Sequence, residues 1–334
     1  MDGRFFVRGA GGGGGGQAIG LACARMTTTC TPLLVLAALA RCAGASCPVA
    51  PNTTAVIYHG DGATAECRQW EADFYAWLGL LAVPMTALEL QSPGCGGRLL
   101  ELGVQIFAMP GGNAYNLQAS AGAAGKVHLL RFIDGGGLYV GTCAGAYYAA
   151  EGYFWQEGEA GGGMFRWSNL LGRFPMVEGS ITDVWDDAVP PGYKLTPLDN
   201  GLHAIYWGGP TRGWRSTPST GAPGTVLARF GAVAGGRLPA AWHVSDDGNG
   251  SRLLFSAHFE AEEGIGIYRT GLTAAMTLAN WRYRASAIAR AAHMPELLAA
   301  LPEERAPPPA ATLAKWMVPD GAQRPTSSHA PGRR

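Results

Sequence analysis

Cys143 is the residue whose neighbours most suggest chemistry. It lies in "GGGLYVGTCAGAYYAAEG" (135–152), where a short apolar run meets Gly-Thr-Cys-Ala-Gly and an Ala/Tyr-rich segment follows. Small neighbours permit the sharp strand-to-helix turn that presents a nucleophile at the end of a sheet. Amides at the start of the next helix favour a thiolate. The same residues also fit a small thiol in a glycine-rich core, and their spacing alone does not separate the two interpretations.

A nucleophilic cysteine needs a base and a group that orients the base. His258 is the distinctive histidine, because it follows the apolar run of "LLFSAHFEAEEG" and precedes Glu260 by two positions. At that spacing in an extended segment both side chains point to the same side, so the carboxylate could hold the imidazole in the needed tautomer. The alternative is an exposed strand end with polar residues. His128, expected inside a helix, and His329, in the tail, are weaker candidates.

An oxyanion hole would complete such a site. The amide of Ala144 and one from Gly111 or Gly112 could stabilise a tetrahedral intermediate. These glycines belong to "MPGG", one of three glycine-rich turns, with "HGDG" and "GTCAG", that each follow an expected strand.

Alternating strands and helices must position these turns. Apolar runs bounded by glycine predict strands, and apolar residues at helical spacing predict helices. In the second helix we expect Val127, Leu130 and Ile133 to point inward. The expected strands are 54–62, 83–90, 104–112 and 138–142, and the expected helices are 65–81 and 123–137. This order is typical of a parallel sheet covered on both faces, with the active site at the carboxyl ends of the strands.

The C-terminal half predicts a mixed or antiparallel extension of the sheet. Strand-like runs there are separated by loop signals. They occur at 176–187, 203–210, 224–230, 238–245 and 251–259. A helix is expected from Thr273 to Leu301, followed by a Pro/Arg-rich disordered tail. The predicted organisation is an N-terminal extension (1–45), one α/β domain (46–301) and the tail (302–334).

The N-terminal segment predicts secretion. Residues 1–25 are a glycine-rich low-complexity segment, Leu33–Ala40 is a short apolar run, and small residues at 43–45 fit a signal peptide that ends near Ala45. The apolar run is too short to span a membrane. Translation could start at Met1 or Met26. A disordered extension is the alternative, and Arg41 counts against a signal peptide. We expect a protein of the secretory-pathway lumen or the extracellular space.

The cysteines and two glycosylation motifs fit that compartment. Asn52 and Asn249 each begin an Asn-x-Ser/Thr acceptor. After cleavage four cysteines would remain, Cys47, Cys67, Cys95 and Cys143, which allow three pairings. If Cys143 stays free, at most one disulfide forms among the other three. Zinc-site spacing is absent, and we expect no metal or cofactor.

Composition argues against some partners. The 25 basic and 25 acidic side chains balance, which gives no reason to expect nucleic acid or an acidic membrane surface as partner. We expect no transmembrane segment, and the oligomeric state stays open.

Four motifs resemble a known family. "FAMPGG", "GGGLYVGTCAGAYYA", "YWGGP" and "LLFSAHFE" follow one another as in the glutamine-amidotransferase-like module at the N-terminus of fungal biotin–protein ligases, which belongs to the class I glutamine amidotransferase superfamily. The resemblance spans roughly Thr54 to Gly264. It implies a flavodoxin-like sheet and a triad in which Cys143 attacks an amide or acyl carbon, His258 shuttles the proton and Glu260 orients His258. Gly111, Gly112 and Ala144 would supply oxyanion or substrate-loop amides.

The sequence also departs from the family. Phe259 replaces the usual proline between His258 and Glu260. Nothing resembles the ligase catalytic domain, so we do not expect biotin attachment. The turn at Tyr206 and Trp207 is characteristic of the module and could line a pocket or be purely structural. Asn113 and Tyr147 are further pocket candidates.

The leading hypothesis is a cysteine-dependent hydrolase of a small amide, γ-glutamyl or peptide-like substrate. One alternative is a non-catalytic secreted binding module on the same fold, favoured if Cys143 is disulfide-bonded. The other is a γ-glutamyl hydrolase-like enzyme.

Overall fold

The computed structural model describes part of the chain. The described residues are 47–156, 164–168, 170–173, 177–179, 193–212, 224–231, 238–245, 250–262, 271–299 and 301. All belong to the compact unit Ser46–Arg334. The predicted signal segment ending near Ala45, the acceptor Asn249 and the tail from Pro302 lie outside the described residues.

A seven-stranded sheet forms the centre of this unit, in the order β11-β12-β13-β4-β3-β1-β2. Its strands are β1 (Ala55–Tyr58), β2 (Ala82–Met85), β3 (Ile106–Met109), β4 (Leu138–Thr142), β11 (Thr225–Arg229), β12 (Pro239–Ser245) and β13 (Ser251–Phe255). The five strands from β13 to β2 pair in parallel, and β12 and β11 are added antiparallel. The predicted α/β, flavodoxin-like class with an antiparallel extension is confirmed.

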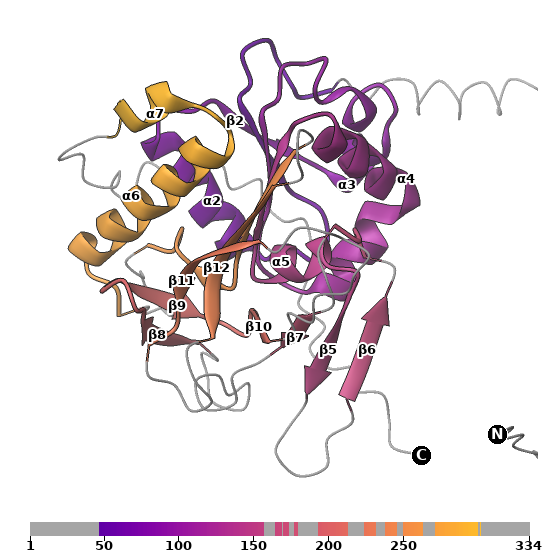
Figure 1. Cartoon of the computed structure of the whole chain (residues 1–334). Helices are drawn as coiled ribbons and strands as arrows, with labels where there is room; N and C mark the ends of the chain where they lie inside the picture. The colour runs from indigo at the N-terminus through magenta and orange to yellow at the C-terminus, as the bar shows by residue number, and fades with distance from the viewer. Residues whose placement is uncertain are drawn as a thin grey trace, which may run out of the picture. The chain divides into compact units, whose positions relative to one another are not determined.

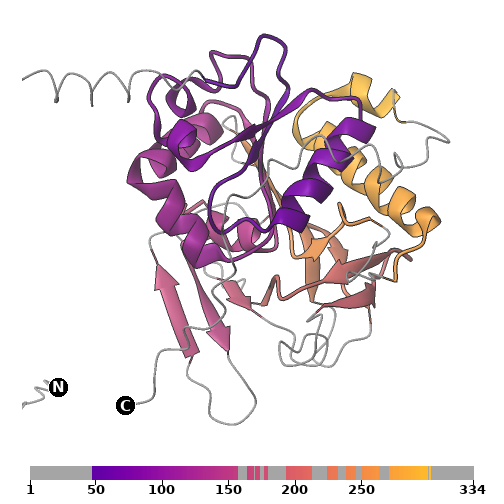
Figure 2. The ribbon, with the colours of Figure 1, turned by 180° about the vertical axis from the view of Figure 1, so that it is seen from behind.

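Helices cover both faces of the sheet (Figures 1 and 2). On one face lie α3 (Ala87–Gln91), α4 (Ala114–Asp134) and α5 (Ala144–Ala149), and on the other lie α2 (Ala65–Trp77), α6 (Ala274–Ala291) and α7 (Pro295–Ala299). Alternate residues of each strand serve the two cores: Val56 and Phe107 face α4, whereas Ile57 and Ala108 face α2 and α6. The central strands read as continuous apolar runs because both faces are buried.

The predicted strand 83–90 is wrong in its second half. The strand ends at Met85, and α3 begins at Ala87. The Thr86 hydroxyl accepts from the Glu89 amide (3.3 Å), and the Glu89 carboxylate accepts from the Thr86 amide (2.7 Å). This capping box stabilises the start of a helix. Its effect exceeds the preference for a strand that the apolar run indicated.

The second predicted helix starts earlier than predicted, and its buried face is rotated relative to the predicted one. Asn113 caps α4 by accepting from the Asn116 amide (3.1 Å), so the helix begins about two turns before residue 123. Val127 is exposed, contrary to the prediction, whereas Leu130 is half-buried and Ile133 is buried. The buried stripe runs through residues 125, 128, 129, 132 and 133, a helical spacing whose centre lies one position away from the predicted one.

The C-terminal helix is broken in two. The predicted span 273–301 contains α6 and α7, with His293 at φ 55° between them. A left-handed residue cannot continue an α-helix.

Two smaller sheets lie in the C-terminal half. They have the orders β10-β7-β5-β6 and β14-β9-β8. Their strands are β5 (Gly152–Gln156), β6 (Met164–Ser168), β7 (Val177–Gly179), β8 (Lys194–Pro197), β9 (His203–Tyr206), β10 (Pro210–Arg212) and β14 (Ala257–His258). Of the predicted strand 176–187, β7 is the part that the structure describes as strand.

Cys47 and Cys95 form a disulfide, with an S–S distance of 1.99 Å. Cys67 and Cys143 are buried free thiols. Within the described ranges no helix has the length and apolar character needed to cross a bilayer.

Candidate active site

The glycine-rich turns lie together at the carboxyl ends of β1, β3 and β4. The Thr64 amide donates to the Gly111 carbonyl (3.1 Å), and the Asn113 amide donates to the Gly62 carbonyl (2.7 Å). A Cβ on Gly145 would stand 2.0 Å from the carbonyl oxygen of Met109. "HGDG", "MPGG" and "GTCAG" therefore contact one another.

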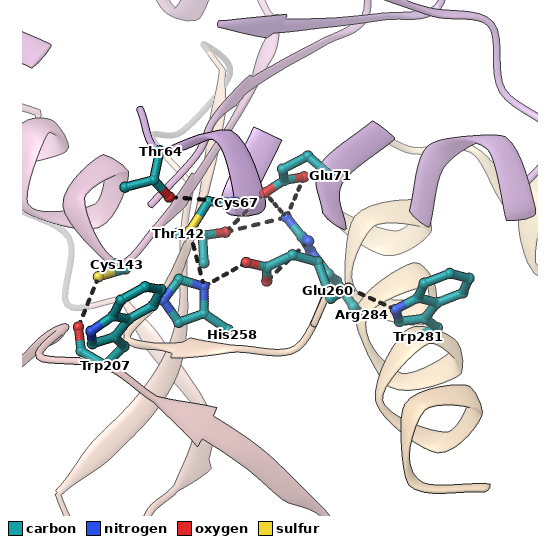
Figure 3. Close-up of polar contacts among 10 residues, drawn as sticks. All are labelled: Thr64, Cys67, Glu71, Thr142, Cys143, Trp207, His258, Glu260, Trp281 and Arg284. Atoms are coloured by element: carbon teal, nitrogen blue, oxygen red, sulfur yellow. Dashed lines mark hydrogen bonds and ion pairs between the residues drawn. The ribbon is translucent and has the colours of Figure 1, made fainter. Parts of the chain in front are cut away.

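Cys143 occupies a strained turn between β4 and α5. Its φ and ψ are 51° and −107°, a conformation that costs a residue other than glycine about 1–3 kcal/mol. The turn is fixed because the Cys143 amide donates to the Phe255 carbonyl (2.7 Å) and its carbonyl accepts from the Ala146 amide (3.0 Å). The thiol donates to the Trp207 carbonyl at 3.4 Å. The side chain is aimed into the site and is largely covered (Figure 3).

His258 comes from β14, the short strand that follows β13 and pairs with β9. Its ring is fully buried, and its Nδ1 lies 2.7 Å from Oε1 of Glu260. Its Nε2 has no hydrogen bond of ordinary geometry with the residues that the structure describes. The rings of Trp70 and Trp207 lie 5.7 and 6.3 Å from the imidazole. The ring is thus held from one nitrogen while the other is unoccupied.

The surroundings of His258 and Glu260 favour a protonated imidazole paired with an ionised carboxylate. Burial lowers the pKa of His258, but the neighbouring Cys67 and Glu260 outweigh it and raise the pKa well above its ordinary value, and Cys143 adds to this rise. Because burial also raises the pKa of the Cys67 thiol, Cys67 is neutral near pH 7 and Glu260 is the partner that retains the proton on His258. Burial opposes the ionisation of Glu260, yet His258 and Arg284 lower its pKa overall.

Gly111 lies in the middle of the site. A Cβ there would stand 2.6 Å from Cε1 of His258, 2.8 Å from Sγ of Cys67 and 3.3 Å from Cβ of Cys143. Glycine is therefore required sterically. Of the other predicted amide donors, Ala144 is buried directly after Cys143, and Gly112 adopts φ 146° beside the Gly62 carbonyl.

The four pocket candidates are used differently. Asn113 caps α4 with its side chain. The hydroxyls of Tyr147 and Tyr206 donate to the carbonyls of Gly208 and Gly209, both at 2.9 Å, and so stabilise the turn that carries Trp207. Trp207 is the candidate whose backbone and ring reach Cys143 and His258.

Phe259, which stands between His258 and Glu260, packs in the core. Its ring lies 5.4 Å from Phe255 and 5.3 Å from Tyr283. Asn52 is exposed and has φ 70°, and its glycosylation stays a prediction.

A buried charge network behind His258 was not predicted. Nη2 of Arg284 lies 2.7 Å from Oε1 of Glu71, and Nη1 lies 3.2 Å from Oε2 of Glu260 (Figure 3). The Thr142 hydroxyl donates to Oε1 of Glu71 at 3.1 Å. All four side chains are completely buried. Their sequence signal is weak, because a charged residue on an amphipathic helix normally faces water.

Cys67 is a further residue that the sequence did not assign to the site. It lies on α2, with its thiol 4.0 Å from Nδ1 of His258. Within the described ranges no group of His, Cys, Asp and Glu is arranged to hold a metal ion.

Comparison with known proteins supports the motif-based resemblance. Residues 54–164 match the family model described as biotin-protein ligase, N terminal, which confirms the predicted similarity over that segment. Cys143 and Gly111 lie inside the matched segment, whereas His258 and Glu260 lie beyond it. With the flavodoxin-like sheet, the match indicates a fold of the glutamine-amidotransferase-like type.

A solved ThuA-like protein from Bacteroides uniformis is 16% identical, with 73% of this chain and 95% of that chain covered and a TM-score of 0.39. No curated protein sequence matches the chain.

Proposed function

We propose, from the similarity of residues 54–164 to the biotin-protein ligase N-terminal family and from the site geometry, that the protein is a cysteine-dependent hydrolase of amide or acyl bonds. One observation carries the proposal. His258 is held by Glu260 through Nδ1 at 2.7 Å, while its Nε2 has no ordinary hydrogen bond among the described residues and the thiol of Cys143 interacts with the ring. This is the arrangement that a cysteine nucleophile and its base require.

The proposed reaction has two steps. In the reactive form His258 already holds the proton of the Cys143 thiol, so Sγ attacks the carbonyl carbon as a thiolate. His258 then delivers that proton to the leaving amine as the C–N bond breaks, which leaves a thioester. Water, deprotonated by His258, then attacks the thioester, and the acid departs as Cys143 regains its proton. Glu260 stays ionised throughout and keeps the ring aligned. The amides of Gly112 and Ala144 are the proposed donors to the oxyanion.

The proposed substrate is a small amide, a γ-glutamyl compound or a peptide-like molecule. Cys143 is 6% exposed, and the rings of Trp70 and Trp207 both pack against His258. This enclosure favours a slender acyl group over a folded protein. No observation favours the binding-module alternative, since Cys143 is free and not disulfide-bonded.

Trapping of the thioester tests the proposal. The protein is mixed with glutamine amides and γ-glutamyl anilides, quenched in acid and analysed by intact and peptide mass. We expect an acyl adduct on Cys143, release of the amine, and loss of both in Cys143→Ala, with Cys67→Ser as the matched control that retains them. Equal turnover by wild type and Cys143→Ala would contradict the proposal.

We also infer a secretory location. The Cys47–Cys95 disulfide supports it, because such bonds persist mainly in oxidising compartments. Sequencing the N-terminus of the mature protein tests this: we expect Ser46, and a mature chain that begins at Met1 or Met26 would contradict it.

A further inference from the structure

We propose that Arg284 is a positioning residue of the candidate site: its guanidinium bridges Glu71 and Glu260 and thereby keeps the Glu260 carboxylate on Nδ1 of His258. The inference rests on the function proposed above. It extends the site by a residue from α6, which the family match over residues 54–164 does not include.

Arg284 connects three elements of the fold. From α6 it reaches Glu71 on α2, with Nη2 at 2.7 and 2.9 Å from the two carboxylate oxygens. Its Nη1 lies 3.2 Å from Oε2 of Glu260, in the turn after β14. One turn earlier on α6, the Trp281 indole donates to the Glu260 carbonyl at 3.0 Å. Helix α6 thus holds Glu260 at both its side chain and its backbone.

The same guanidinium also reaches the turn that carries the nucleophile. Nη2 of Arg284 donates to the Thr142 hydroxyl at 3.3 Å, and that hydroxyl donates to Glu71 at 3.1 Å. Thr142 directly precedes Cys143. The segment that carries His258 and Glu260 and the turn that carries Cys143 are therefore both contacted by the buried guanidinium of Arg284 (Figure 3).

The pKa shifts of Glu71 and Glu260 explain why the site needs the positive charge of Arg284. Burial raises the pKa of Glu71, whereas His258 and Arg284 lower the pKa of Glu260 despite its burial. Of the two carboxyls that contact Arg284, Glu260 is thus the one whose ionised form its surroundings favour overall. A neutral Glu260 would hold the His258 proton less well.

Other ionisable groups face this pair from the elements packed around it. They are Cys67, Glu71 and Tyr75 on α2, Cys143 before α5, and Arg284 on α6. Arg284 is the cation of this set that stays charged at every ordinary pH.

The test measures the rate at which iodoacetamide alkylates Cys143 at pH 6 and at pH 9.5. At pH 6 the thiol reacts only if an aligned His258 takes its proton, whereas at pH 9.5 an ordinary thiol ionises unaided. For Arg284→Met we expect the rate at pH 6 to fall about tenfold, the equivalent of one pH unit, with the rate at pH 9.5 within about twofold of wild type. Arg284→Lys keeps the charge but cannot bridge, so we expect an intermediate loss.

Two further variants make the test robust. Glu71→Gln retains an oxygen for Nη2 and leaves the Arg284–Glu260 pair intact, so we expect the rate at pH 6 to stay at the wild-type level or above. The double variant Glu71→Leu/Arg284→Met removes the buried pair without leaving an unpaired charge between its partners and is expected to fold. It should show the same loss at pH 6. Circular dichroism and thermal melting check the fold of each variant.

The outcomes separate this inference from the proposed function. A wild-type rate at pH 6 in the folded Arg284 variants, or an equal loss at both pH values, overturns the positioning role, and so does a wild-type Cys143 that is unreactive at pH 6. An Arg284-dependent rate at pH 6 in a protein that hydrolyses nothing upholds the positioning role and rejects the hydrolase.

Discussion

Two free thiols lie beside the same imidazole but are placed for different chemistry. Cys143 stands in a strained turn, its thiol donates to the Trp207 carbonyl, and it contributes to the raised pKa of His258. Cys67 lies 4.0 Å from Nδ1, the nitrogen already engaged by Glu260, and burial raises its pKa. The two residues are therefore a natural matched pair for assigning the nucleophile.

We predict that iodoacetamide alkylates Cys143 at least tenfold faster than Cys67 at pH 7, because a thiolate is favoured only where a base takes the proton. Peptide mass spectrometry after timed quenching measures both rates. Cys67→Ser should change the rate at Cys143 by less than about threefold. Preferential labelling of Cys67 would assign the reactive thiol to α2.

The His258–Glu260 pair makes a second prediction, on stability. The folded protein raises the pKa of His258, so the stabilisation is complete below its unfolded value near 6.5 and is lost as the pH rises through the folded value. Glu260→Gln should therefore lower the free energy of unfolding more at pH 6 than at pH 10. Urea titrations at both pH values measure this. An equal penalty at both would contradict the pairing.

At the scale of elements, α2 meets the turn after His258 through two carboxyls. Burial and the neighbouring Asp73 raise the pKa of Glu262 to about 8, while Gln69 donates to both oxygens of Asp73 at 2.9 and 3.0 Å. The carboxyl groups of Asp73 and Glu262 therefore share one proton. The contact between α2 and this turn is therefore strongest in acid.

We predict that wild type loses stability relative to Glu262→Gln as the pH rises. A raised folded pKa gives stability that is fully present below pH 4.5 and is lost by about pH 8. The glutamine keeps a donor for Asp73 but cannot ionise. Melting temperatures at pH 5, 6.5 and 8 test this, and parallel curves for the two proteins would rule out the shared proton.

Elements differed in how far the sequence could predict them. The central strands are apolar runs between glycine turns, so their existence and order were predictable. The helix α3 was missed although Thr86-x-x-Glu89 is a capping-box signature, because an apolar run masked it. The orientation of Val127 was wrong by about one helical position, since the buried stripe of α4 includes Gly125 and His128, which carry no apolar signal that a periodicity argument could follow.

The site was predictable where its spacing is local. Cys143 was indicated by its small neighbours, and His258 with Glu260 by their separation of two. Glu71 and Arg284 are 213 positions apart, and each lies on a helix whose buried face is marked by aromatic residues, Phe74 and Trp77 on α2 and Trp281 on α6. Only the packing of α2 against α6 brings the two charges together, and no local pattern encodes that contact.

At the scale of the whole molecule, the Cys47–Cys95 bond closes a segment of 48 residues that contains β1, α2, β2 and α3. Chain-entropy arguments assign such a loop about 4 kcal/mol of stabilisation. The bond joins residues on the side of the sheet that carries α3 and α4, away from the buried charge network between α2 and α6.

We predict that Cys47→Ser/Cys95→Ser lowers the free energy of unfolding by about 2–4 kcal/mol while the alkylation rate of Cys143 at pH 6 stays within about twofold of wild type. Urea denaturation and timed labelling measure the two quantities. A large drop in labelling by the folded variant would show that the bond also supports the site.

The positive φ of Cys143 has a consequence for how this protein diverges. Glycine would occupy that turn without strain, so selection for the fold alone would replace the thiol and gain stability. A cysteine there costs stability, as expected where function and stability oppose each other. Among homologues, glycine at this position beside an intact Glu71–Arg284 pair would mark lineages that have abandoned the chemistry and retained the scaffold.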